Sequence, residues 1–263
     1  MIRIPLYQVD AFVTDGPFTG NPAAVCPLDA WLPDGVMQAI AAENNLSETA
    51  FFVPEGDGYR LRWFTPTVEV DLRGHATLAS GFVVLGWLAP GRTSITFQTE
   101  KAGELTVARD GELLALDLPA RPAALCPMSD AVAAALGKRP TALLAARDYL
   151  AVYDSPDDIA ALSPDFTAVA ALDRFAVIVT APGSGGIDFV SRFFAPARGV
   201  PEDPVTGSAH CTLVPYWAER LGKTRLEARQ LSRRGGALSC ALLGGRATLA
   251  GRAVLYLDGT ITI

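Results

Sequence analysis

Two segments decide the fold: Phe64-Thr-Pro…Asp71-Leu-Arg-Gly74-His75-Ala-Thr-Leu78 and Phe194-Ala-Pro…Glu202-Asp203-Pro-Val-Thr-Gly207-Ser208-Ala-His-Cys-Thr-Leu213. In each, an aromatic strand-like run meets Pro, passes an acidic patch and reaches Gly before an apolar helical stretch. A repeat at this separation predicts two related lobes, whose helix starts face each other across one cleft. N–H groups at such a helix start bind anions, because they combine donors with the positive end of the helix dipole. We therefore expect a small anionic substrate held between the lobes.

Length, composition and charge limit the class of protein. The chain has 263 residues, of which 50% are hydrophobic, so it exceeds the usual size of one domain and can form sizeable cores. Its 22 basic and 28 acidic residues leave a formal net charge of −6, without a basic block of the kind that neutralises phosphates. We therefore expect no nucleic-acid partner.

The cysteines and the apolar stretches indicate the compartment. The four cysteines are scattered without a CxxC pair, which argues against a zinc site or a disulfide framework: Cys26, Cys126, Cys211 and Cys240. The N-terminus lacks a basic region followed by a long apolar core. The longest apolar stretch, near Leu78 to Ala89, is well short of the roughly 20 residues that cross a bilayer. We expect a cytoplasmic protein that does not enter a membrane.

Periodicity predicts mostly strands. Alternation of apolar and polar residues marks strands at 2–9 and 59–64, and β-branched and aromatic runs mark others at 175–180 and 187–194. Turn dipeptides predict hairpins at Asp110-Gly111, Gly244-Gly245 and Asp258-Gly259, the last joining 253–257 to 260–263. The predicted sheets are largely antiparallel or mixed.

Four helices are predicted, at Pro33 to Asn44, Gly74 to Leu88, Ser129 to Leu136 and Ser208 to Leu221. The second is apolar nearly all round, so other structure must enclose it, and a curled sheet would do so. Pro215 should bend or locally break the fourth helix. Prolines interrupt the pattern between Leu118 and Pro127, which places a lobe boundary there.

Glu48 is the first candidate for chemistry. It lies in Asn45-Leu-Ser-Glu48-Thr-Ala-Phe-Phe-Val, just before a strongly apolar strand. Desolvation by such walls can raise the pKa of a carboxyl group toward the working pH, which suits it to proton transfer. The structural alternative is a solvated glutamate at a strand end, because most carboxylates are exposed.

His75 follows Gly74 at the first helix start, and the only other histidine, His210, lies in the second copy. An imidazole at a helix N-terminus is held toward its neutral form by the local positive field, which suits hydrogen-bond donation or proton relay. A capping or core role is the alternative, more so for His210. Metal ligation would need more clustered ligands than these segments contain, so we expect no metal.

Asp203 and Ser208 are candidates at the second helix start. The turn Pro204-Val-Thr-Gly207 between them can return both side chains to one spot. Asp203 could then fix a polar substrate group, while Ser208 gives a hydroxyl and a backbone N–H to an anion. The alternative is a turn and a helix cap, which are common uses of Asp and Ser.

Two other kinds of enzyme site are not supported. A Gly-x-Ser-x-Gly elbow, which would mark a serine nucleophile, is absent. The glycines at 183–186 follow one strand and precede another, whereas a dinucleotide fingerprint opens a helix. Hydride chemistry is therefore not expected.

Taken together, the motifs resemble one known family. Its blocks occur in register over most of the chain, at Gly20-Asn-Pro-Ala-Ala-Val-Cys26, Asn45-Leu-Ser-Glu48-Thr-Ala-Phe, Phe64-Thr-Pro…Glu69-Val-Asp-Leu-Arg-Gly-His75-Ala-Thr-Leu-Ala and Glu202-Asp203-Pro-Val-Thr-Gly-Ser208-Ala-His. By these blocks the chain resembles the PhzF (phenazine biosynthesis) family. The resemblance implies an α+β, diaminopimelate epimerase-like fold, in which two pseudosymmetric lobes each roll a mostly antiparallel or mixed sheet around a central helix. The implied active site lies between the lobes.

On this resemblance we expect lobes at 1–118, with central helix 74–88, and at 119–263, with central helix 208–221. The last strands are free to pair with the first lobe.

The resemblance also implies a reaction. In the family's characterised phenazine enzyme, a glutamate moves a proton between carbons of dihydro-hydroxyanthranilate without cofactor or metal. Glu48 matches that glutamate. His75, Asp203 and Ser208 match the other polar positions around the substrate, while Gly74 and Gly207 open the helix starts that hold its carboxylate. A homodimer is suggested by the resemblance alone.

Two positions depart from the related sequences. Related epimerases and racemases have a cysteine immediately before each helix glycine, whereas Arg73 and Thr206 occupy those positions here. Two-thiol epimerisation is therefore disfavoured. Many members of the family that the chain resembles also have cysteine before the Gly-His pair. We expect Arg73 to bring a cation near the mouth of the site, the alternative being that it faces solvent or pairs with Asp71 or Glu69.

The expected function is a cofactor-independent isomerase that shifts a proton, and with it a double bond, in a small cyclic or amino carboxylic acid. Two alternatives stay open. One is a racemase or epimerase of an amino-acid-like substrate, and the other is a non-catalytic module that binds a small molecule or a protein. The motifs do not name the substrate, and nothing in them ties the chain to phenazine production.

Overall fold

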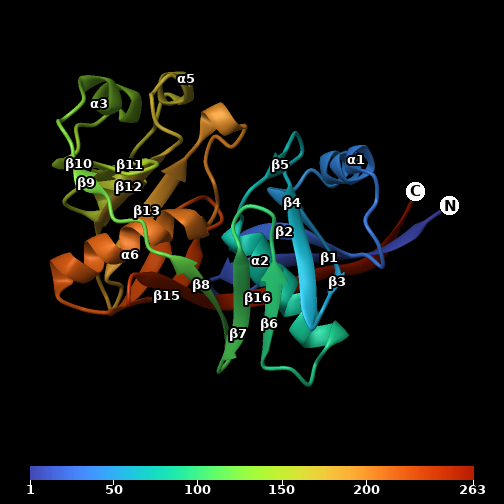
Figure 1. Cartoon of the computed structure of the whole chain (residues 1–263). Coiled ribbons are helices and arrows are strands. Elements are labelled where there is room, and N and C mark those ends of the chain that lie inside the picture. The colour runs from blue at the N-terminus through green and yellow to red at the C-terminus, as the bar shows by residue number, and fades with distance from the viewer. The chain divides into compact units, whose positions relative to one another are not determined.

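The computed structural model describes all residues, 1–263, and the chain divides into two compact units (Figure 1). The first unit comprises residues 1–117 and 250–263, and the second comprises residues 118–249. The expected boundary was at 118/119, with the last strands allowed to pair with the first lobe; in the structure the first stretch ends at residue 117, and residues 250–263 belong to the first unit. No helix is long and apolar enough to cross a membrane.

A ring of strands forms the first unit. Its members are β1 (Arg3–Val13), β2 (Asn21–Pro27), β3 (Glu48–Glu55), β4 (Gly58–Phe64), β6 (Ser94–Gln98), β7 (Glu104–Asp110), β8 (Leu113–Pro119) and β16 (Arg246–Thr262). Neighbouring strands follow this order, and β16 pairs with β1 as well as with β8, so the order returns to its start. The short β5 (Glu69–Val70) pairs with β4. The predicted Asp110-Gly111 hairpin is confirmed between β7 and β8.

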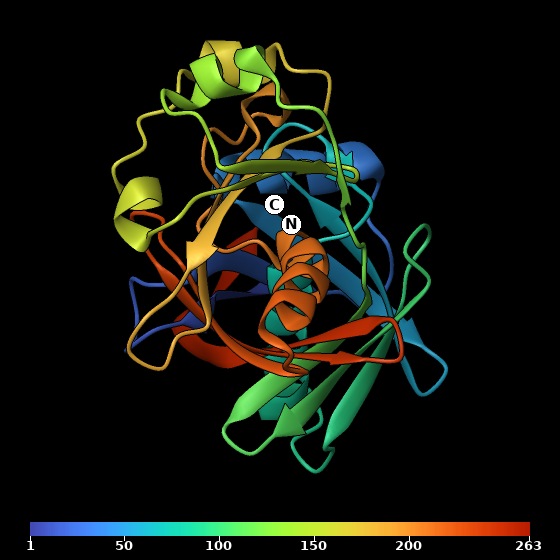
Figure 2. The same ribbon diagram turned by 90° about the vertical axis from the view of Figure 1, so that its left-hand side faces the viewer.

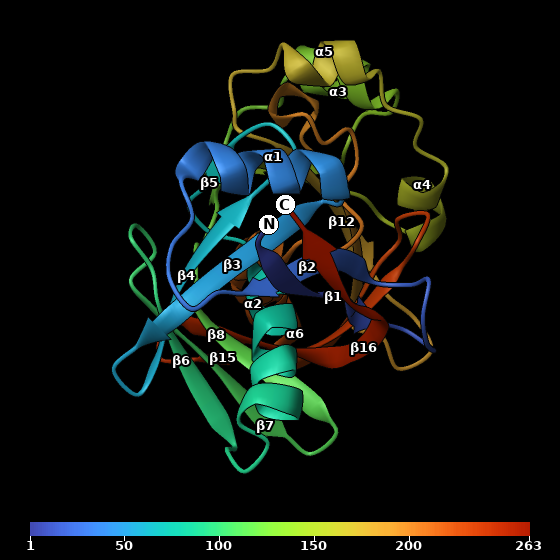
Figure 3. The ribbon, with the colours of Figure 1, turned by 90° about the vertical axis from the view of Figure 1, so that its right-hand side faces the viewer.

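Helix α2 (Gly74–Val83), continued by a π-helical turn at Val84–Leu88, is the central helix of this unit. It contacts β1, β2, β3 and β7, and every residue from Gly74 to Gly81 is buried. An all-apolar helix needs such an enclosure, which confirms the expectation of a curled sheet around it. Helix α1 (Asp34–Asn44) lies outside the ring across β3 and β4 (Figure 3), and its Met37 and Ile40 pack on Phe51 and Phe64.

The predicted hairpin at Asp258-Gly259 is wrong. Strand β16 runs straight through these residues, and Asp258 and Gly259 pair with Tyr7 and Leu6 of β1. A long partner strand supplies hydrogen bonds on both sides of the dipeptide, and this tertiary pairing overrides the local turn signal. The two chain ends consequently lie side by side (Figure 3), with Ile2 and Ile263 joined by two backbone hydrogen bonds of 2.7 and 2.9 Å.

The second unit contains the rest of the sheet, which continues from β16. Its strands, in spatial order, are β15 (Gly236–Leu243), β14 (Arg225–Gln230), β13 (Phe189–Phe194), β12 (Val177–Pro182), β11 (Tyr149–Val152), β10 (Ala142–Ala145) and β9 (Ala124–Leu125). The start of β16 adjoins β15 through the predicted Gly244-Gly245 turn. On one face lie α3 (Asp130–Leu136), α4 (Pro156–Ala160) and α5 (Phe166–Ala170), which share an apolar core with β10 to β13. A short 3-10 turn spans Pro196–Arg198.

Helix α6 (Gly207–Leu221) lies among the strands of this unit (Figure 2), in contact with β14 and β15. Pro215 was expected to bend or locally break α6, and the break is absent, because α6 is one continuous helix through it. Proline cannot donate to the carbonyl four residues earlier, that of Cys211. The backbone N–H of Arg121 donates to this carbonyl instead, at 2.7 Å. An outside donor therefore repairs the gap that Pro215 leaves.

The internal repeat is confirmed by the strand pairings. From β1 to β7 the neighbouring pairs are antiparallel, parallel, antiparallel, parallel and antiparallel. From β10 to β15 the same five orientations recur in the same order. In each unit the helix that starts at a repeat glycine, α2 or α6, is the crossover of the second parallel pair, as parallel strands require.

Close packing of α2 against the ring predicts the effect of one methyl group. A Cβ at Gly81 would lie 2.5 Å from Cγ1 and 2.6 Å from Cβ of Val107 on β7, whereas one at Gly86 meets nothing within 4 Å. We expect Gly81→Ala to lower the free energy of unfolding by about 1–3 kcal/mol. Gly86→Ala should leave it unchanged or raise it by up to about 1 kcal/mol.

Urea unfolding of both variants measures the difference. Equal effects at the two glycines would show that α2 and β7 are not packed as described.

Candidate active site

Three elements of the first unit bring polar side chains to one place. Asn21 is the first residue of β2 and Glu48 the first of β3, and these strands are parallel neighbours with Ala23 opposite Glu48. Helix α2 begins beside them with Arg73, Gly74 and His75. Two strand starts and one helix start therefore supply the cluster.

The Glu48 carboxylate is the centre of this cluster. Its side chain is only 4% exposed, so the alternative of a solvated glutamate is wrong. The Arg73 Nε–H donates to Oε1, and the Nε2 of His75 lies 2.8 Å from Oε2. The start of α2 thus places the guanidinium on one carboxylate oxygen and the imidazole beside the other.

Asn21 sets the tautomer of His75. Its Nδ2 amide donates to Nδ1 of the imidazole at 3.2 Å, so that nitrogen acts as the acceptor. The ring proton of a neutral imidazole then sits on Nε2, which faces Glu48. His75 is therefore buried with its Nε2 close to the Glu48 carboxylate.

The expectation of a raised pKa for Glu48 is wrong in direction. Burial alone would raise the pKa of this carboxyl group, but His75 and Arg73 outweigh burial and hold the pKa below its usual value. Glu48 is ionised at neutral pH, as a proton acceptor must be. The sequence showed the apolar residues that follow Glu48, but it did not show that His75 and Arg73 lie beside the carboxylate.

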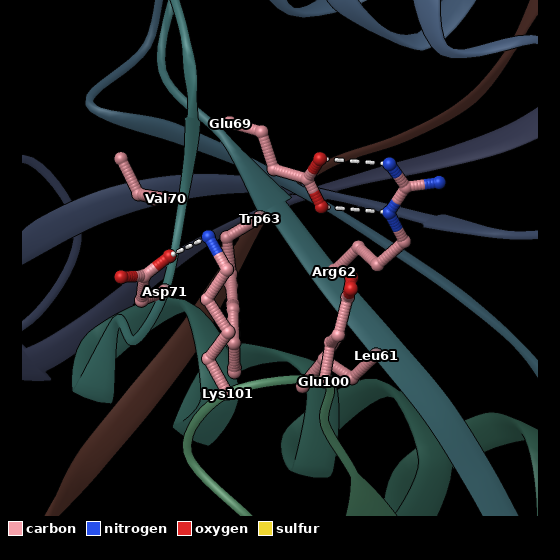
Figure 4. A pocket seen from close by; sticks show the side chains of 8 residues that line it. All are labelled: Leu61, Arg62, Trp63, Glu69, Val70, Asp71, Glu100 and Lys101. Atoms are coloured by element: carbon pink, nitrogen blue, oxygen red, sulfur yellow. Dashed lines mark hydrogen bonds and ion pairs between the residues drawn. The ribbon is translucent and has the colours of Figure 1, made fainter.

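Arg73 pairs with Glu48 rather than with the acidic residues closest to it in sequence. Arg62 holds Glu69 through two bonds of 2.7 Å, and Lys101 holds Asp71 at 2.7 Å (Figure 4). These pairs flank a cavity of about 220 Å³, whose other lining residues are Leu61, Trp63, Val70 and Glu100. The alternative partners for Arg73 are thereby occupied, and that interpretation is wrong.

Asp203 belongs to a buried network in the second unit. Thr206 donates its hydroxyl to Asp203 Oδ2. Gln230 on β14 donates to the Asp203 carbonyl at 2.8 Å and to Thr206 Oγ1 at 3.1 Å, and it accepts from the Thr206 N–H at 2.9 Å. Gln230 therefore fixes the loop that leads into α6.

Ser208, one residue after Gly207, has a different partner. Arg147 donates from Nη2 to its hydroxyl at 3.3 Å and grips the buried Asp148 with two bonds of 2.9 and 2.8 Å. The sequence predicts that the side chains of Asp203 and Ser208 meet at one spot. In the structure each has its own hydrogen-bond partner, Thr206 for Asp203 and Arg147 for Ser208. A guanidinium stands beside the start of α6, as another does beside the start of α2.

The two repeat helices begin without a side-chain cap. Short helices α3, α4 and α5 are capped by Ser129, Ser155 and Asp165, whereas α1, α2 and α6 are not. At α2 and α6 the residues in the cap position, Arg73 and Thr206, bond Glu48 and Asp203 instead. The first N–H groups of these helices therefore remain available for an anion.

His210 has a core position in α6. Its Nδ1 lies 2.8 Å from the Thr206 carbonyl, its Nε2 has no partner, and its ring packs near Phe189. Burial lowers the pKa of His210 to about 4. The imidazole is therefore neutral near pH 7, and the core interpretation fits it.

Three cysteines are buried and unpaired, at positions 26, 211 and 240. Burial raises the pKa of Cys26 to about 12 and that of Cys211 to about 11, and it also raises the pKa of Cys240. Thiols of this kind are inert as bases or nucleophiles. No group of three or more His, Cys, Asp or Glu side chains is arranged to hold a metal ion.

Sequence reasoning missed three supporting residues. Asn21 lies inside a recognised motif block, so a search for partners of His75 could have found it. Arg147 and Gln230 carry no local signal, because β11 and β14 bring their neighbourhoods to α6 only in the folded unit.

The repeated α+β architecture and the site at the glycine-opened helix define the class of protein: a diaminopimelate epimerase-like fold. The fold is shared with a "predicted epimerase" from Pseudomonas aeruginosa, at 21% identity and a TM-score of 0.76 over 99% of each chain.

The family follows from closer matches. The profile of the phenazine biosynthesis-like protein family, PhzC-PhzF, matches residues 9–259. An "uncharacterized isomerase" from Pseudomonas aeruginosa is 53% identical over 260 residues, which cover 99% of each chain. The crystal structure of a PhzF-family phenazine biosynthesis protein from Enterococcus faecalis is 45% identical, with a TM-score of 0.96 over 100% of both chains. This chain belongs to the phenazine biosynthesis-like (PhzC-PhzF) family.

The buried His210 predicts a loss of stability in mild acid. Between pH 6.5 and about 4 the unfolded chain binds a proton on this histidine that the folded chain does not bind. Stability therefore falls as the pH falls through this window, by about 3 kcal/mol in total. Urea unfolding across the window should show a shallower pH dependence for His210→Leu.

The ring of His210 should also keep its neutral NMR signal until the pH approaches 4. A titration midpoint near the usual 6.5 would contradict the burial described here.

Proposed function

We propose that this protein is a cofactor-independent isomerase that moves a proton between carbon atoms of a small carboxylic acid, with Glu48 carrying the proton. One observation carries the proposal: an ionised, buried carboxylate is held at a helix start by a guanidinium, with an imidazole nitrogen 2.8 Å from its other oxygen. A carboxylate fixed in this way is a pre-oriented general base.

The proposed reaction conserves atoms and charge. Glu48 accepts a proton from a saturated carbon of the substrate, and the electron pair of that C–H bond shifts an adjacent double bond. The carboxylic acid so formed returns the proton to the carbon at the far end of the shifted system. Product and substrate are therefore isomers, and Glu48 ends ionised as it began.

The remaining candidate residues bind and orient the substrate in this proposal. His75 keeps its Nε2–H on the Glu48 carboxyl group or on a polar group of the substrate. The uncapped N–H groups at Gly74 and Gly207 are suited to the substrate's carboxylate. In the second unit, Asp203 and Ser208 are proposed as contacts to polar substrate groups.

A racemase with two thiol bases is not favoured. Arg73 and Thr206 stand immediately before the helix glycines, and neither can act as a thiol. The buried cysteines have raised pKa values, so they do not supply a thiolate near neutral pH. A single carboxylate base fits the side chains that are present.

The test is proton exchange at carbon. Small carboxylic acids, including dihydro-hydroxyanthranilate and related amino acids, are incubated with the protein in deuterated water. Mass spectrometry then reads deuterium gain, and ultraviolet absorbance reads movement of the double bond. Glu48→Gln should lower the rate by about 10²- to 10⁴-fold, the usual contribution of a general acid–base group.

Glu55→Gln is the matched control, because Glu55 is an exposed residue at the other end of β3. Full turnover by Glu48→Gln would remove Glu48 from the proposed role. Binding of an acid without exchange or conversion would favour the non-catalytic binding module. Activity lost on thiol alkylation would instead favour the racemase.

The second unit is tested by Ser208→Ala. If the hydroxyl binds an anionic substrate group, the variant should raise KM about tenfold or more with little change in kcat, since a hydrogen bond to a charged group is lost. Ser239→Ala is the control, because Ser239 bonds Glu227 on the exposed face of β14 and β15. An unchanged KM for Ser208→Ala would remove this contact from the proposal.

A further inference from the structure

Arg73 has a structural role that the proposed proton transfer does not yet use. In the folded protein its guanidinium closes over one oxygen of the Glu48 carboxylate, while His75 occupies the other. A carboxylate with a guanidinium bonded to one oxygen and an imidazole close to the other is stabilised in its ionised form and is a weak acceptor for a carbon-bound proton. For Glu48 to act as a base, one of these two partners has to yield.

The two partners differ in their freedom to move. His75 is 3% exposed and is fixed from behind by Asn21. The Arg73 side chain is 21% exposed, and its other recorded bond is a long one, 3.3 Å from Nη1 to the Leu72 carbonyl. Arg73 is therefore the partner that can leave.

The position of Arg73 also indicates which kind of group would replace Glu48 as its partner. It immediately precedes Gly74 and His75, whose uncapped N–H groups are the part of the first unit suited to a carboxylate. The nearby acids Asp71 and Glu69 already have Lys101 and Arg62, so they do not compete for it (Figure 4). An anion bound at the start of α2 would be the new partner within reach.

We propose that Arg73 is a positioning residue that exchanges partners: it pairs with Glu48 in the free protein and with the carboxylate of the substrate when that is bound, which frees Glu48 Oε1 for the proton. The inference rests on the proposed function and deepens it. It confines proton abstraction to the occupied site, and it selects substrates that carry a carboxylate.

The electrostatics support this exchange. The charged and titratable groups that face Glu48 are Arg73 and His75, both from the start of α2, and they hold its pKa down against the effect of burial. An anion that neutralises Arg73 leaves burial opposed by His75 alone, so the pKa of Glu48 rises. Binding of the anion and of a proton to Glu48 are then coupled, and the coupling must be reciprocal.

The test measures the titration of Glu48 directly and needs no turnover. Protein labelled with ¹³C at the glutamate side chains is titrated by NMR, and Glu48→Gln assigns the signal. The probes are acetate and benzoate, with benzamide as the neutral counterpart of benzoate. Either carboxylate should move the Glu48 midpoint to higher pH in the wild-type protein, whereas benzamide should not.

Variants separate the exchange from a merely structural role. In Arg73→Gln the Glu48 midpoint should already lie higher without a probe, and carboxylate affinity should fall about tenfold or more with the loss of a charge-assisted bond. Arg73→Lys keeps the charge and should restore much of both effects. Arg60→Gln removes an exposed arginine that is paired with Glu55, and it should change neither.

The outcomes distinguish this inference from the proposed function. A Glu48 midpoint that neither carboxylate moves, or that Arg73→Gln leaves in place, overturns the exchange even if deuterium incorporation shows Glu48 to be the base. A midpoint that moves as described supports the exchange even if none of the acids tested is converted, because the coupling is a property of binding.

Discussion

A helix without a solvent face is the constraint on which the first unit depends. Residues Gly74 to Gly81 are all buried, so the sheet must surround α2 completely. Seven strands from the N-terminal part of the chain do not complete that enclosure, and β16 closes it by pairing with both β8 and β1. The same enclosure delivers the start of α2 to the starts of β2 and β3, where the polar cluster lies. The enclosure of α2 by the sheet therefore determines both the apolar core and the place of the polar cluster.

The cluster itself is a small group of charges in an apolar setting. Removing one member of a buried ion pair typically costs about 3–5 kcal/mol, because the other charge is left without a partner. Glu48 avoids this cost through Arg73 and His75, and His75 in turn depends on Asn21. Such an arrangement holds the carboxylate in one orientation, which is the kind of preorganisation that the proposed proton transfer needs.

Local signals in the sequence were sufficient for most of the fold. The glycine-centred repeat, the four longer helices and two of the three hairpins depend on residues close in sequence, and the structure contains them. The turn at Asp258-Gly259 failed because its competitor, β1, is distant in sequence. Pro215 failed to break α6 because Arg121, far away along the chain, supplies the missing donor.

For the candidate site, the residues could be predicted, but their pairing and the direction of the Glu48 pKa shift could not. Glu48, His75, Asp203 and Ser208 were recognisable from motif and position. The partner of Arg73 was not, since the acids nearest in sequence are taken by cations from other strands. The direction of the Glu48 pKa is the difference between burial and two neighbours, and only coordinates reveal all three. In the second unit β12, the equivalent of β3, carries no carboxylate, so the repeat of the scaffold does not include a counterpart of Glu48.

The closure of the first ring by β16 bears on the order in which the protein is made. On the ribosome, β1 to β8 emerge first, yet the strand that completes their ring, at residues 250–262, emerges more than 100 residues later. The second unit, at 118–249, is fully synthesised before that happens. Domains generally fold as units during synthesis. The first unit is therefore completed after the second, although its synthesis starts earlier. Until β16 has been made, the edge of β1 lacks this partner strand and the ring around α2 stays open.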